Sequence, residues 1–180
     1  MSQVPTDVPG SSVPGSTPNP APNLASGPAI RIFVDADACP VKEEVFRVAT
    51  RCGLKVLLVS NSPLRVPRNP LFESVVVAKG QFDGADDWIV EQITATDIAV
   101  TADIPLAARC LEKGARALDA KGRVYSPESI GDALASRELM THLRAMGEMG
   151  TGPAPFTTRD RSTFLQRLDD LIQALRRTRR

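Results

Sequence analysis

The sequence predicts a three-layer α/β domain with a mainly parallel sheet of about five strands, helices on both faces and further helices at the C-terminal end. Short apolar runs rich in β-branched residues alternate with longer stretches of helical periodicity. Strands that are separated by helices favour a parallel sheet, and right-handed crossovers bring the carboxyl ends of the strands to one edge.

Composition divides the chain into two parts. Residues 1–28 are rich in Pro, Ser, Gly and Asn and carry a single charged side chain, Asp7, so they bury too little apolar surface to fold, and we expect a disordered tail. The 180-residue chain is 42% hydrophobic, which is enough for one domain with a real core, and we assign residues 29–180 to it.

Charge, cysteine content and hydropathy exclude several classes of protein. The net charge is +1, so nucleic acid has to be bound by a local patch rather than by a global field. The three cysteines form neither a disulfide framework nor a zinc pattern, and no apolar run approaches the length of a membrane span. We expect a cytoplasmic protein in a reducing compartment that does not bind membranes, and we leave its oligomeric state open.

The first half of the domain begins with a short buried strand. Pro40 suits the first turn of the helix that follows this strand, and Gly53 suits the end of that helix. Three prolines between residues 61 and 70 forbid regular structure there. We therefore expect strands at 30–34, 55–60 and 74–78, a helix at 41–52, and a second helix that begins near Asp86.

In the second half, a strand that ends in an acid and is followed by proline and a helix occurs again. Ser126 followed by Pro127 is typical of a helix start. Apolar residues at helical spacing near the C-terminus predict an amphipathic final helix. We expect strands at 98–101 and 115–119, and helices at 106–113, from 126 to about 146, and at 160–174.

Acidic residues lie where the predicted strands end. Asp35 and Asp37 follow the first strand, Asp103 follows the fourth, and Asp86 begins a helix. Clustered carboxylates repel one another, and a hard cation such as Mg²⁺ or Mn²⁺ relieves that repulsion. We therefore predict these four acids as metal ligands and catalytic residues, while helix capping and surface charge remain nearly as good an interpretation from the residues alone.

Basic residues accompany the predicted acidic edge. We predict contacts to nucleic-acid phosphates from six side chains, although for any single arginine of the loop a solvated connection is the stronger interpretation. They are Lys42, Arg65, Arg68, Lys79, Arg159 and Arg161.

Four segments resemble the YaiI/YqxD family of uncharacterised bacterial proteins. They are 35–42 (DADACPVK), 82–86 (FDGAD), 100–107 (VTADIPLA) and 150–156 (GTGPAPF), the last with Arg159 and Arg161, and the similarity covers about residues 30–175. The resemblance implies a PIN-like domain, similar to metal-dependent nucleases, with Asp35, Asp86 and Asp103 as ligands and Asp37 as a fourth. It also suggests that the Gly/Pro loop folds back over the site.

The chain departs from the family pattern in two places. The tail before Ala29 is additional, and Asp119 stands where we expect asparagine, so we do not count it as a ligand.

Three functions remain open at this stage. The first is a Mg²⁺- or Mn²⁺-dependent phosphodiesterase that acts on nucleic acid, RNA more than DNA. The second is a phosphatase of the haloacid dehalogenase type, with Asp35 as nucleophile, Asp37 as acid/base, and Thr101 with Lys79 or Lys113 in support. The third is a non-catalytic module that binds nucleic acid or protein.

Overall fold

A six-stranded sheet forms the centre of the chain in the computed structural model, which describes residues 29–37, 39–77, 84–147 and 155–178. The strands are β1 (Arg31–Asp35), β2 (Lys55–Ser60), β3 (Phe72–Val76), β4 (Ile98–Val100), β5 (Arg116–Leu118) and β6 (Val124–Tyr125). The helices are α1 (Lys42–Cys52), α2 (Gly84–Gln92), α3 (Ile104–Glu112), α4 (Pro127–Ala145) and α5 (Thr158–Thr178). The predicted tail at 1–28 lies outside the described residues.

The strand order is β3-β2-β1-β4-β5-β6. The strands β1 to β5 pair in parallel, which confirms the predicted α/β class, whereas β6 pairs antiparallel with β5. We did not predict β6 as a strand, because two residues carry no periodic signal. Its direction follows from the short turn before it, since a parallel strand needs a crossover of a dozen or more residues.

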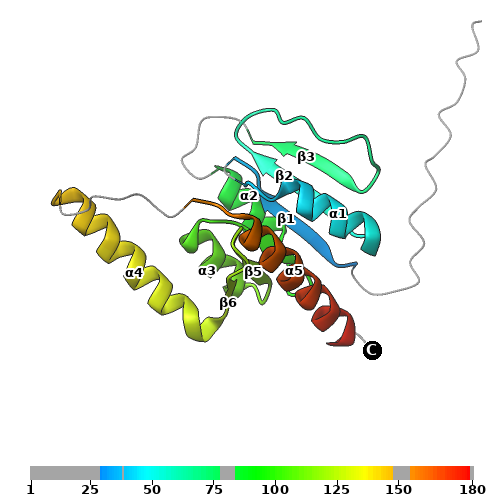
Figure 1. Cartoon of the computed structure of the whole chain (residues 1–180). Helices are drawn as coiled ribbons and strands as arrows, with labels where there is room; N and C mark the ends of the chain where they lie inside the picture. Colours follow the sequence, from blue (N-terminus) through cyan, green and yellow to red (C-terminus); the bar gives the residue numbers. More distant parts are fainter. Residues whose placement is uncertain (1–28, 38, 78–83, 148–154, 179–180) are drawn as a thin grey trace, which may run out of the picture.

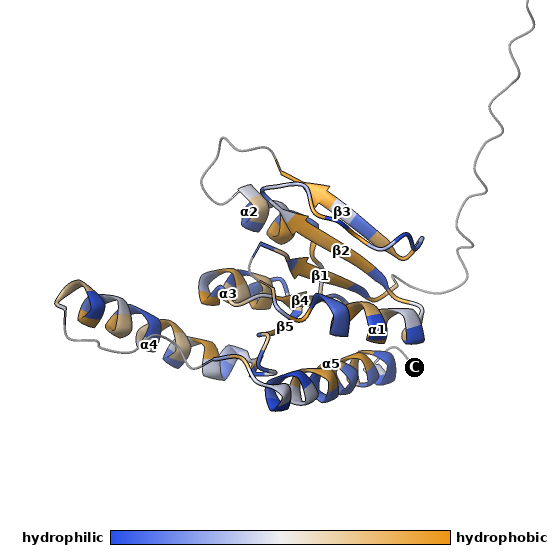
Figure 2. Cartoon of the chain, turned by 45° about the horizontal axis from the view of Figure 1, so that its top comes forward, coloured by the Kyte–Doolittle hydropathy of each residue, from blue (hydrophilic) through white to orange (hydrophobic). Residues whose placement is uncertain are grey.

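Helices cover both faces of the sheet (Figure 1). On one face, α1 and α5 pack over a core that contains Val34, Val45 and Phe164. On the other face, α2, α3 and the base of α4 enclose a second core around Phe33 and Ile89. Figure 2 shows hydrophobic residues along β2 and hydrophilic stripes on α5, as burial of one helix face requires. The three layers are those expected of a PIN-like domain.

Helix α4 projects away from the three layers (Figure 1). Ala133 is its buried residue, whereas Leu139, Met140 and Met146 at its far end are exposed. Its start is as predicted, because Ser126 accepts the N–H of Ser129 and Pro127 occupies the first turn. None of the described helices is both long and apolar enough to cross a membrane.

Several element boundaries differ from the prediction. Strand β3 begins at Phe72, two residues earlier than expected, because its register pairs Phe72 with Val56. Helix α5 extends four residues beyond the predicted end at Ala174, since Leu175 is also buried against the core. Its earlier start places Arg159 in the first turn of a helix rather than in a loop.

Candidate functional site

The order in which the chain adds strands to the sheet reverses between β1 and β4. From β1 the chain continues outward to β2 and β3 on one side, and it then crosses to β4 and β5 on the other side. Open α/β sheets bind ligands in the crevice outside the carboxyl ends of their strands at such a switch point. Asp35 ends β1, while Thr101 and Asp103 follow β4, so these residues lie at the crevice.

A chain of hydrogen bonds connects the ends of β1 and β4. The hydroxyl of Thr101 donates to Asp35 Oδ2 over 2.9 Å and accepts the backbone N–H of Asp103, also over 2.9 Å. Asp103 Oδ1 in turn accepts the N–H of Leu106 and caps α3. Asp103 therefore caps α3 and also lies near Asp35. Its role as a helix cap and its predicted role as a metal ligand are compatible.

The pKa of Asp35 is altered by its surroundings at the end of β1. Burial raises its pKa above the ordinary value, and the neighbouring charges of Asp37 and Asp103 raise it further. The hydrogen bond from Thr101 acts in the opposite direction. Asp37 and Asp103 are thus both close enough to repel the Asp35 carboxylate, and a cation relieves such repulsion.

Asp37 is held by the loop that follows β2. Its Oδ2 accepts both the backbone N–H of Asn61, over 3.1 Å, and the Asn61 side-chain amide, over 2.9 Å. Arg65 and Arg68 are exposed further along the same loop. The structure thus brings the base of the predicted basic loop to the acidic edge.

Asp86 lies in the first turn of α2, next to helix α3. Burial raises the pKa of the Cys110 thiol on α3 to about 12, and Arg109 opposes this rise while Asp86 adds to it. The carboxylates that raise the pKa of Asp35 include Asp37 and Asp103. Asp86 therefore stays a predicted ligand that the structure connects to α3.

The four predicted acids do not form a closed metal cage among the described residues. Across the described ranges, no three Asp, Glu, His or Cys side chains are placed to hold a metal ion together. One reason is that Asp37 is turned to Asn61 and Asp103 to the start of α3. Mg²⁺ is commonly bound by one or two carboxylates together with waters and substrate phosphates, so the donor set fits that kind of site.

A small pocket lies next to Asp35. Cys39, Thr101 and Ala120 help to line it, and its volume of about 10 Å³ is close to the space that one water molecule requires. Burial raises the pKa of the Cys39 thiol to about 11, so the sulfur stays protonated at neutral pH. Cys39 also packs against the core, so a structural role accounts for it.

Two of the predicted basic residues are held by hydrogen bonds, Lys42 beside the acids and Arg161 beside Glu44. The ammonium group of Lys42 donates to the carbonyl of Ala36, between Asp35 and Asp37 in sequence, over 2.9 Å. Arg161, at the start of α5, forms an ion pair with Glu44. The predicted contact residue Lys79 and residues 150–154 of the Gly/Pro loop lie outside the described residues, so closure of this loop over the site stays a prediction.

Glu44, a buried acid on α1, was not among the predicted site residues. Its Oε1 accepts from Arg161 over 2.6 Å, whereas its Oε2 is buried and has no hydrogen-bond partner among the described residues. A signal was present, because position 44 falls on the same helical face as Val41, Val45 and Val48.

A second missed residue, Arg137, reaches the site from α4. Its guanidinium lies 3.8 Å from Asp103 Oδ2. No local pattern connects a mid-helix arginine with an acid 34 positions earlier, so the tertiary structure was needed to find it.

Comparisons with known proteins place this chain among bacterial relatives. The model of the family described as "Uncharacterized BCR, YaiI/YqxD family" matches residues 33–174. A UPF0178 protein of Rhodospirillum centenum is 60% identical over 152 residues, which cover 82% of this chain and 98% of the relative. A UPF0178 protein of Rhodopseudomonas palustris is 54% identical over 149 residues, which cover 83% of this chain and 90% of the relative. No solved structure matches the chain significantly.

Proposed function

Since the chain belongs to the uncharacterised YaiI/YqxD family, its activity has to be inferred from its own site, and we propose that it is a Mg²⁺- or Mn²⁺-dependent phosphodiesterase that cleaves nucleic acid. The observation that carries the proposal is the position of Asp35. Its carboxylate lies at the switch point of the sheet, and Asp37 and Asp103 are close enough to raise its pKa.

The acids have the chemistry that a hard cation selects. Asp35 would hold the ion together with waters and substrate phosphates, and Asp37 and Asp103 would join it by turning from Asn61 and from the start of α3. Asp86 is the further ligand that the family resemblance implies. A bound Mg²⁺ or Mn²⁺ supplies charge stabilisation and lowers the pKa of water. Thr101, which is itself buried, keeps the Asp35 carboxylate in a fixed orientation.

Basic side chains around the edge suit a polyanionic substrate. Lys42 is fixed next to the acids, and Arg161 is fixed by Glu44 at the start of α5. Arg65, Arg68 and Arg159 are exposed, and together with Lys79 they would contact phosphates rather than bases. We take RNA as the first substrate to test, because the family resemblance is to PIN-like nucleases.

The direct test combines metal binding with cleavage. Mn²⁺ is titrated by calorimetry into the wild-type protein, Asp35→Asn and Asp103→Asn, and each is then incubated with a mixed-sequence RNA and with the matching DNA. Asparagine keeps the oxygen that caps α3 and the oxygen that accepts from Thr101, so both variants are expected to stay folded. Asp170→Asn, an exposed change on α5, is the matched control.

We expect Mn²⁺ binding and metal-dependent cleavage in the wild type and the control, and loss of both in the two site variants. Undiminished cleavage by Asp35→Asn, or a wild-type protein that binds no Mn²⁺, would refute the proposal. A phosphoryl group trapped on Asp35 after incubation with a phosphate monoester would favour the phosphatase instead. Binding of a partner without any turnover would indicate a non-catalytic module.

A further inference from the structure

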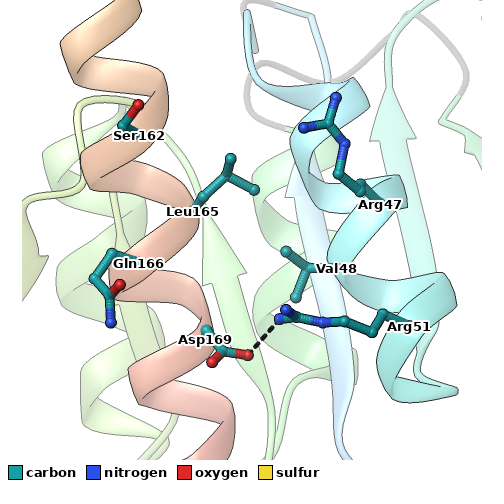
Figure 3. A pocket seen from close by; sticks show the side chains of 7 residues that line it. All are labelled: Arg47, Val48, Arg51, Ser162, Leu165, Gln166 and Asp169. Carbon is teal, nitrogen blue, oxygen red and sulfur yellow. Dashed lines mark hydrogen bonds and ion pairs between the residues drawn. The ribbon is translucent and has the colours of Figure 1, made fainter.

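The helices α1 and α5 enclose a groove on the outer surface of one face of the sheet (Figure 3). Three contacts hold the helices side by side in the same direction: Glu44 with Arg161, Arg51 with Asp169, and the carbonyl of Cys52 with Arg176. The groove between them has a volume of about 380 Å³, which is within the range of small-molecule sites.

The groove has an apolar floor and charged ends. Val48 and Leu165 approach each other across it and form an apolar floor (Figure 3). The ion pair between Arg51 and Asp169, 2.6 Å long, crosses from one helix to the other at one end. Arg47 lies toward the other end, so the floor is bordered by a neutralised pair and by a second cation.

The charges of the groove do not balance. Arg47 is exposed and makes no hydrogen bond or ion pair within the described part of the chain. Asp169 neutralises Arg51, so two arginines and one aspartate leave one net positive charge in the lining. An unengaged guanidinium above an apolar floor is suited to an anionic group, because its planar fork donates two parallel hydrogen bonds to oxygens of phosphate or carboxylate.

We propose that this groove is a binding site for the phosphate group of a ligand, with Arg47 as its main donor. A phosphate presents three acceptor oxygens, so it can engage Arg47 and still reach a second donor across the groove. Ser162 is such a donor, because its hydroxyl makes only a long 3.3 Å bond to the carbonyl of Thr158 and is free to rotate. The body of the ligand then rests on Val48 and Leu165.

The groove is separate from the acidic site. Arg47 lies five residues along α1 from Lys42, which corresponds to roughly 8 Å of helix leading away from the acids. Two ligands present the required phosphate there: a free phosphate monoester such as a nucleotide, or the backbone of a nucleic acid that also occupies the acidic edge. The second source rests on the proposed function, whereas the first does not.

Binding is measured in EDTA, so that metal-dependent cleavage plays no part in the result. Adenosine 5′-monophosphate is titrated by calorimetry, and a fluorescently labelled RNA of twelve nucleotides is titrated by anisotropy. The variants are Arg47→Ala and, as a control that removes the same charge, Arg167→Ala on α5. Arg167 makes only an exposed 3.9 Å contact with Asp170 and does not line the groove.

We expect Arg47→Ala to weaken binding of at least one ligand by about tenfold or more relative to Arg167→Ala, with an unchanged melting temperature because Arg47 makes no bond to lose. Weakening for the nucleotide alone identifies a free monoester as the ligand, and weakening for RNA alone identifies the backbone. Equal affinities in both variants, or a wild type that binds neither probe, would overturn the proposal. Mn²⁺-dependent cleavage is measured separately, so failure of the groove is distinguishable from failure of the nuclease.

Discussion

The ion pair between Glu44 and Arg161 offers a sharp test of how α5 is attached to the domain. The Glu44 side chain is 6% exposed, whereas the Arg161 side chain is 44% exposed. Because Oε2 of Glu44 already has no partner among the described residues, Arg161→Ala leaves a buried carboxylate with no partner on either oxygen. Arg161 also lies over the ring of Phe156 at 5.2 Å, so the truncation removes that contact as well.

The size of the effect follows from the exposure of the two partners. Breaking a fully buried pair costs about 3–5 kcal/mol, but the opening left by Arg161 admits water to Glu44. We therefore expect Arg161→Ala to lower the free energy of unfolding by about 2 kcal/mol. Arg51→Ala breaks an ion pair whose partners are 63% and 33% exposed, and we expect a loss of less than about 1 kcal/mol.

Urea unfolding at pH 7, followed by circular dichroism, measures both losses. The double variant Glu44→Gln with Arg161→Ala supplies the decisive comparison, because a neutral amide is less costly to bury than an unpaired charge. We expect it to recover part of the stability that Arg161→Ala loses. Equal losses for Arg161→Ala and Arg51→Ala, or a double variant less stable than Arg161→Ala, would refute the reasoning.

Two further predictions concern Asp35 and the glycines. The folded state raises the pKa of Asp35, so its ionised form destabilises the fold above that pKa, and the penalty disappears as the pH falls toward the ordinary pKa of 3.8. Asp35→Asn should therefore be more stable than the wild type at pH 7, with a difference that shrinks on acidification in urea titrations. Gly122→Ala should destabilise by about 1–3 kcal/mol more than Gly53→Ala in the same assay. Both glycines have positive φ. A Cβ added at Gly122 lies 2.9 Å from the backbone nitrogen of Phe164, whereas a Cβ added at Gly53 meets nothing within 4 Å. Similar losses of stability in the two variants would contradict the predicted difference.

Local signals in the sequence were sufficient for most of the elements. Alternation of apolar runs and helical periodicity predicted the α/β class, and residues with fixed backbone preferences marked ends such as Gly53 and Ser126. The positions of Asp35 and Asp103 after strands were also visible, because Asp35 directly follows one apolar run and Asp103 comes two residues after another. Short elements without a period, such as β6, were not predictable in this way.

The sequence by itself determined which residues end strands, begin helices and face a core, since these properties depend on neighbours within a few positions. Only the tertiary structure decided that β4 pairs with β1, and therefore that Asp103 lies beside Asp35. It also decided that α5 packs on α1, which buries Glu44 under Arg161 and creates the groove at Arg47. These arrangements join residues that are distant in sequence, and strand order and helix packing are set by the burial of whole faces rather than by any local pattern.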